Sequence, residues 1–169
     1  MRISDKICLV HSVKRASRFR FLYIAIACPI AMTAVGNASA GQLLPLTATK
    51  SFNPTIVNVG STSQMTISVH NPNRGAISGI HFDDVFPPGM TNVMGNPIVS
   101  SNCGGTLVAQ PNGTEVDVSG VTLPPAGSCS VIVNVVGNFT GILINHTGTL
   151  YAPGTPIGAG AQANLHVIP

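Results

Sequence analysis

The chain contains no tryptophan, and only 5% of its 169 residues are aromatic and 8% are charged. Antibody-type domains pack a buried Trp against their disulfide, so the lack of Trp argues against that class. So few charges also make a disordered chain or a long charged helix a poor description. The 13 Pro and 18 Gly residues indicate instead a turn-rich, apolar fold, and the length suits one domain.

Basic residues are scarce after Ala40. Six of the eight Lys and Arg residues lie in the first twenty positions, and from Gly41 onward only Lys50 and Arg74 are basic, against four acidic residues. That part of the chain therefore has a net charge of −2, although the whole sequence carries +3. Two dispersed cations cannot neutralise a run of phosphates, which excludes nucleic acid as a partner.

The first forty residues have the three parts of a secretory signal. A basic stretch precedes 15 mostly apolar residues, 21–35, and small residues follow up to Ala40. The apolar run is shorter than the ~20 residues that a membrane-spanning helix needs. We therefore expect residues 1–40 to be a signal peptide cleaved between Ala40 and Gly41, leaving no membrane span in the mature chain. An uncleaved anchor and a lipoprotein modified at Cys28 are the alternatives.

Two cysteines remain after the expected signal, Cys103 and Cys129. An even number in an exported chain predicts a disulfide. Cys129 shares its strand face with the valines that follow it, and Cys103 has the parity of Leu107, so both thiols are expected to face a core. Closing this loop would stabilise the fold by roughly 3 kcal/mol in the chain-entropy description. The spacing fits neither a metal site nor a redox C-x-x-C pair.

After Ser51 apolar residues recur at every second position in short segments, and Pro/Gly turns separate these segments. The alternating segments are 65–69, 80–82, 116–118, 129–135 and 161–167. Short strands at this spacing predict an all-β protein, an immunoglobulin-like β-sandwich of about seven or eight strands. We expect residues 41–50 to be an irregular leader and residues 51–169 to form the sandwich.

Five segments, in this order, resemble a family of bacterial surface-protein repeat domains, which are Ig-like modules of unknown function. The segments are Ser51-Phe52-Asn53-Pro54 with the residues to Gly60, Ser68 to Asn73, Phe82 to Met90, Asn102 to Gly105, and Leu123 to Cys129. The resemblance covers about residues 49–169, in a single copy. It implies a β-sandwich, pairing of Cys103 with Cys129, and a spacer or adhesive role, and it brings no catalytic residues.

Residues able to perform catalysis or bind a metal form no recognisable pattern. Four histidines follow the signal, and three of them occupy polar positions of alternating strands. The four are His70, His81, His146 and His166. Adjacent carboxylates on a strand face opposite sides, so Asp83 and Asp84 are expected to supply strand-end polarity and turn capping. We therefore expect no enzyme, no cofactor and no metal site.

Lys50 is the only lysine after the signal, and it precedes the first expected strand. An amide crosslink between a Lys and an Asn would need an Asn that faces the core. Asn134 points away from the inferred core, and no other partner is evident. We therefore expect the mature protein to lose only the two hydrogens of its disulfide.

These observations favour a secreted or cell-envelope structural or interaction module without catalytic activity. Such a module would be periplasmic, on the cell surface or extracellular, and its partners would be other envelope or surface proteins. The alternative is a carbohydrate- or ligand-binding β-sandwich, although such modules usually display aromatic platforms and few aromatic residues remain here. An enzyme is the third hypothesis, and nothing in the motifs favours it.

Overall fold

The computed structural model describes residues 42–169, which form eleven strands and no helix. No helix in this range could therefore cross a membrane. The strands are β1 Thr47–Asn53, β2 Ile56–Asn58, β3 Thr62–His70, β4 Ile77–Val85, β5 Met90–Asn92, β6 Ile98–Ser101, β7 Thr106–Val108, β8 Glu115–Leu123, β9 Ser128–Gly137, β10 Gly141–Thr147 and β11 Gln162–Ile168.

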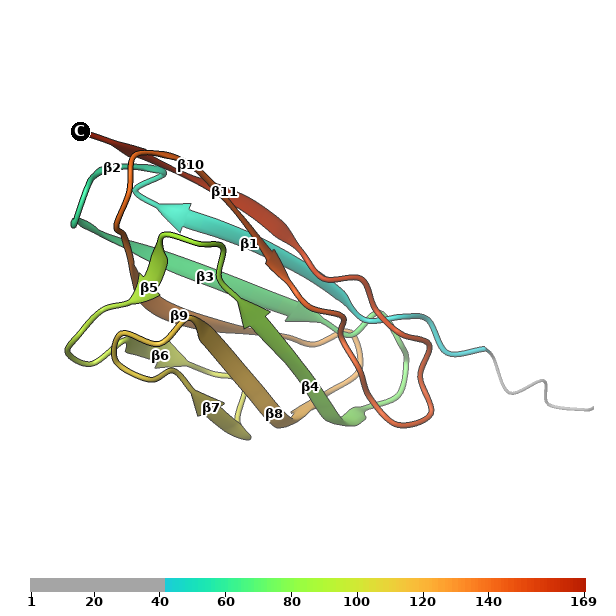
Figure 1. Cartoon of the computed structure of the whole chain (residues 1–169). Helices are drawn as coiled ribbons and strands as arrows, with labels where there is room; N and C mark the ends of the chain where they lie inside the picture. The colour runs from blue at the N-terminus through green and yellow to red at the C-terminus, as the bar shows by residue number, and fades with distance from the viewer. Residues whose placement is uncertain (1–41) are drawn as a thin grey trace, which may run out of the picture. The chain divides into compact units, whose positions relative to one another are not determined.

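The strands form two sheets that pack face to face as a β-sandwich (Figure 1). The first sheet has the order β1-β3-β9-β5, and β6 also pairs with β9. The second has the order β2-β11-β10-β4-β8-β7. The all-β sandwich expected from the sequence is confirmed. The strand number is higher than expected because β2, β5, β6 and β7 have only three or four residues each, too few to show an alternating pattern.

The core lies between the sheets and consists mainly of β-branched and aliphatic side chains. The longest pairing joins β3 to β9 over nine residues, and every second residue of both strands points inward. Met65, Val131 and Val133 are completely buried there. Full burial of one such side chain contributes about 1.5–3 kcal/mol, so these alternating positions account for much of the cohesion of the two sheets.

The first strand begins inside the segment that was expected to be an irregular leader. β1 starts at Thr47 and pairs antiparallel with β3 along its whole length, so the leader prediction for residues 41–50 is wrong from residue 47 on. The strand was missed because most of its residues are polar. Beyond Asn53 the chain passes to the other sheet, where β2 pairs parallel with β11.

Two buried asparagines organise the turns at one end of the sandwich. The side-chain nitrogen of Asn71 donates to the backbone carbonyls of Gly75 and Pro124, both at 2.9 Å. Its oxygen accepts from the backbone and side chain of Asn73, whose own amide donates to the carbonyl of Leu44. Buried polar groups need such partners. These bonds tie the segment before β1 to the β3–β4 and β8–β9 turns.

Candidate functional site: a buried polar cluster between the sheets

A cluster of four polar side chains interrupts the apolar core. Lys50 comes from β1 in the first sheet. Asp84 lies on β4, and Asn145 and Thr147 lie on β10, in the second sheet. Asp84 and Thr147 are direct cross-strand neighbours, so a short pairing between β4 and β10 places the carboxylate beside both β10 side chains.

Asp84 is the centre of the cluster, since three donors meet its carboxylate. The Nζ atom of Lys50 pairs with Oδ2, and both side chains are 0% exposed. The hydroxyl of Thr147 donates to the same oxygen at 2.7 Å. The side-chain nitrogen of Asn145 donates to Oδ1 at 2.8 Å. The carboxylate is thus fully satisfied inside the protein.

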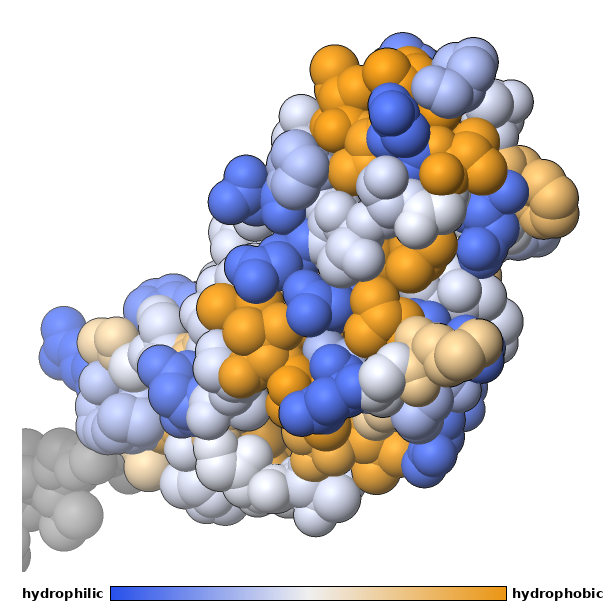
Figure 2. Space-filling view, turned by 90° about the vertical axis from the view of Figure 1, so that its left-hand side faces the viewer, coloured by the Kyte–Doolittle hydropathy of each residue, from blue (hydrophilic) through white to orange (hydrophobic). Residues whose placement is uncertain are grey.

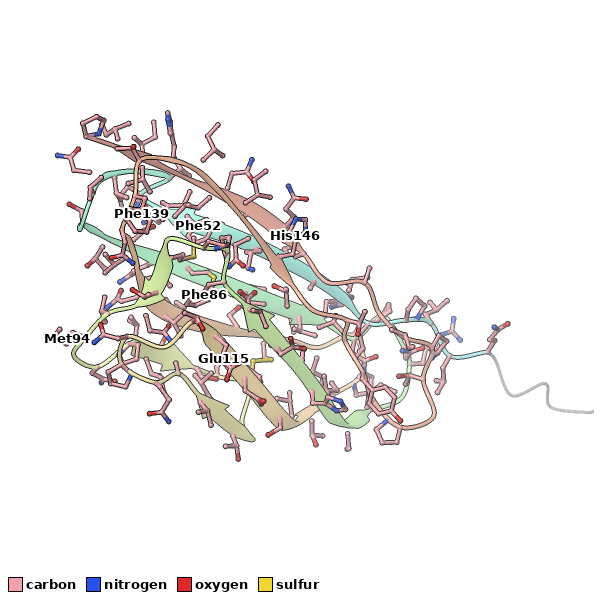
Figure 3. All side chains as sticks on the ribbon, viewed as in Figure 1. Phe52, Phe86, Met94, Glu115, Phe139 and His146 are labelled. Atoms are coloured by element: carbon pink, nitrogen blue, oxygen red, sulfur yellow. A yellow bond between two sulfur atoms is a disulfide. The ribbon has the colours of Figure 1, made fainter. Side chains whose placement is uncertain are left out.

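Strand alternation explains why these polar groups face inward. Lys50 lies two residues before Phe52, and Asn145 lies two residues after Leu143, so each shares a face with an apolar residue that is buried. Phe52 points into the sandwich, whereas His146, next to Asn145 in the sequence, lies on the outer side (Figure 3).

Burial changes the acid–base behaviour of the lysine. Loss of hydration lowers the pKa of Lys50 below its ordinary value of 10.5, and the attraction and hydrogen bond of Asp84 only partly oppose this effect. The lysine therefore gives up its proton more readily than a lysine in water does.

Asn145 holds a buried acceptor that has no partner. Its Oδ1 atom accepts no hydrogen bond, whereas its nitrogen faces Asp84 and lies 3.2 Å from the sulfur of Met65. Only the nitrogen can donate to a carboxylate, so its hydrogen bond to Asp84 fixes the orientation of the amide. A buried carbonyl without a donor is costly, and this one belongs to the same cluster as the amine of Lys50.

A disulfide makes a second, covalent connection between segments that belong to different sheets. Cys103 and Cys129 are both buried and form a disulfide, with 4.8 Å between their Cα atoms. Cys129 lies on β9 in the first sheet, and Cys103 lies in the segment that leads from β6 to β7 in the second sheet. The bond thus fixes the place where the chain crosses between the sheets.

The sequence-predicted residues divide into three groups. Cys103 and Cys129 meet, as just described. The expected cleavage site at Ala40 and Gly41 lies outside the described residues. The expected role of Asp84 is wrong, because this carboxylate is buried in the core rather than capping a turn, while Asp83 is exposed.

Sequence reasoning also missed Asn145 and Thr147, although a usable signal existed. Asp84 has the parity of Ile80 and Phe82, and all three face inward. Extending the alternation by one step would have placed a carboxylate in the core. Among residues 42–169 no three His, Cys, Asp or Glu side chains are close enough together to hold a metal ion.

A family model described as a domain of unknown function, DUF7933, matches residues 46–167. The chain belongs to this family. The match starts at Leu46, the buried residue just before β1, and ends one residue before the end of β11. The DUF7933 domain therefore includes all eleven strands and the complete polar cluster. No curated protein matches the chain.

Solved structures with the same fold are distant in sequence. A non-cellulosomal cohesin from Archaeoglobus fulgidus is 13% identical, with a TM-score of 0.52, over 75% of this chain and 93% of the cohesin. The N-terminal domain of a Streptococcus gordonii adhesin is 14% identical, with a TM-score of 0.53, over 72% of this chain and 32% of that one. The major pilin SpaD of Corynebacterium diphtheriae is 12% identical, with a TM-score of 0.50, over 73% and 33%. At these identities the likeness shows the fold of the DUF7933 domain alone.

Proposed function

We propose that the DUF7933 domain is an exported structural or interaction module of the bacterial cell envelope, without catalytic activity. The observation that carries this proposal is the way its ends are placed and tied. The start of β1 and the C-terminus lie at opposite ends of the sandwich (Figure 1), so tension on a chain that runs through the domain would pass along its strands.

The terminal strands suit such a role. β2, near the start of the domain, pairs parallel with β11, the last strand. Pulling the two ends apart would therefore slide these strands along each other and load their hydrogen bonds together rather than one at a time. Behind them, the Lys50–Asp84 pair and the Cys103–Cys129 disulfide connect segments of both sheets.

The comparisons and the sequence support the same proposal. Domains of a cohesin, a pilin and an adhesin share the fold, and their names describe interaction and surface-structure proteins. The signal-like N-terminus and the disulfide are both typical of exported chains. Other envelope or surface proteins are the partners that this role requires.

Fractionation of a bacterium expressing the full chain tests the proposal. We expect the protein in the periplasm, on the surface or in the medium, starting at Gly41, with no free thiol at Cys103 or Cys129. A cytosolic protein with an intact N-terminus and two reactive thiols would contradict it.

One observation favours the alternative, a ligand-binding module. Phe139, in the turn between β9 and β10, is 70% exposed, and Met94 is 77% exposed; both lie on the same side of the domain (Figure 3). The face turned toward that side carries hydrophobic side chains in several groups separated by hydrophilic ones (Figure 2). A glycan array separates the two functions, since binding that Phe139→Ser abolishes would favour the alternative.

A further inference from the structure

We propose that Lys50 and Asn145 become joined by an amide bond between their side chains, with Asp84 as the catalytic residue that relays the proton. The inference rests on the buried cluster alone and does not depend on the proposed function. Nothing in the family description assigns a role to these residues.

The geometry brings the reacting groups together through one carboxylate. The Nζ atom of Lys50 donates a hydrogen bond to Oδ2 of Asp84, and the side-chain nitrogen of Asn145 donates one to Oδ1 at 2.8 Å. The amine and the carboxamide therefore lie on neighbouring sites of the same group, with the amide carbon one bond from the held nitrogen. Such fixed proximity replaces a bimolecular encounter and can supply a large part of a barrier.

The amine must be neutral to act as a nucleophile, and the site favours that state. Burial lowers the pKa of Lys50, and Asp84 is in place to accept its proton directly. In a core with both side chains 0% exposed, a neutral amine beside a neutral carboxyl group avoids the desolvation cost of two buried charges. The Thr147 hydroxyl, 2.7 Å from Oδ2, keeps the carboxyl group oriented during this transfer.

The unpartnered oxygen of Asn145 gains a role in the same step. Once protonated, Asp84 has a hydrogen to donate, and a half-turn of the Asn145 amide lets Oδ1 accept it. That hydrogen bond satisfies the orphaned acceptor and polarises the carbonyl toward attack. Before this rotation the oxygen has no hydrogen-bond donor, which is the arrangement that the structure shows.

The reaction balances without a further reactant. The lone pair of Nζ forms a bond to Cγ of Asn145, and the electrons of the carbonyl π bond move to Oδ1. Asp84 carries a proton from Nζ to the departing nitrogen. The carbonyl re-forms as the bond from Cγ to that nitrogen breaks, and ammonia leaves. Oxidation states do not change, and the absence of exposed surface at the cluster keeps water from competing for the carbonyl carbon.

The product would join β1 in the first sheet to β10 in the second by a covalent bond. This reverses the expectation from the sequence, which found no partner for Lys50 because only Asn134 was considered. Asn134 lies on β9 and is partly exposed, whereas Asn145 is completely buried. Asn145 is therefore an Asn whose side chain faces the core, as the crosslink requires.

Intact mass spectrometry of the exported full-length protein, reduced and denatured, tests the proposal. We expect the measured mass to be lower by one ammonia than that calculated for the sequence from Gly41 onward, and a proteolytic digest to contain a branched peptide joining Lys50 to Asn145. A full-mass protein, or a Lys50 that reacts with an amine label after denaturation, would overturn the proposal.

Three variants and one control identify the atoms involved. Lys50→Met, Asn145→Ala and Asp84→Asn should each restore the ammonia, whereas Asn134→Ala should keep the loss. An Asn-Gly pair such as Asn112-Gly113 can also lose ammonia by forming a succinimide. Peptide mapping of the unchanged protein distinguishes that case and does not require any variant to fold. A loss that maps elsewhere, or that persists in Lys50→Met, overturns the crosslink, and one that persists in Asp84→Asn overturns the role of Asp84.

Discussion

Asp84 and Asp83 are neighbours in β4 with opposite surroundings, because successive side chains of a strand point to opposite faces. Asp83 is exposed, whereas Asp84 is completely buried and receives three donors. The same carboxylate chemistry is therefore a solvated surface charge at one position and the centre of an internal network at the next.

Replacing Asp84 should cost far more stability than replacing its neighbour. Asp84→Ala leaves the amine of Lys50 buried without a partner, and breaking a buried pair in this way costs about 3–5 kcal/mol. Asp83→Ala removes an exposed charge and should stay within about 0.5 kcal/mol of the unchanged protein. Urea unfolding of both variants measures the difference. Equal midpoints for the two would show that the cluster contributes nothing to stability.

At the scale of elements, the alternating strands could be predicted and the polar or very short ones could not. β3 and β9 keep a strict alternation over nine and ten residues, so sequence alone placed their cores. The first part of β1, residues 47–50, was assigned to an irregular leader because most of its residues are polar. A strand of three residues such as β2 is fixed by its pairing with β11, which no local pattern reveals.

The polar cluster escaped prediction for a related reason. Its members come from β1, β4 and β10, and only the folded sheets bring them together. The alternation near Phe82 and Leu143 does indicate that Asp84 and Asn145 face inward. It cannot show that Lys50 reaches them from the opposite sheet, because that depends on how the two sheets pack.

The disulfide should have a measurable effect on the crossing between the sheets. It joins the segment after β6 to β9, and loss of a native disulfide typically costs about 2–5 kcal/mol. The double variant Cys103→Ala with Cys129→Ala should therefore melt about 8–20 °C lower, taking roughly 4 °C per kcal/mol. Thermal unfolding of the oxidised protein beside the variant measures this. Melting temperatures within about 3 °C of each other would show that the bridge is not structural.

At the scale of the whole domain, the ion pair and the disulfide connect segments of the two sheets in addition to the packing of the core. The ends of the domain lie far apart (Figure 1). The disulfide encloses the segment from Cys103 to Cys129, and the proposed bond encloses residues 50–145, which contain that segment. Under tension, a chain tied in this way would transmit force from β1 to β10 without passing it through most of the core.

Pulling single molecules by their two ends tests this account most directly, with the disulfide kept oxidised. If Lys50 is bonded to Asn145, only the residues outside 50–145 can extend when the domain unfolds, so the gain in length should be short. Lys50→Met should release residues 50–145 apart from the loop closed by the disulfide, and should unfold at a lower force with a much longer extension. Equal extensions for the two proteins, both long, would contradict the account.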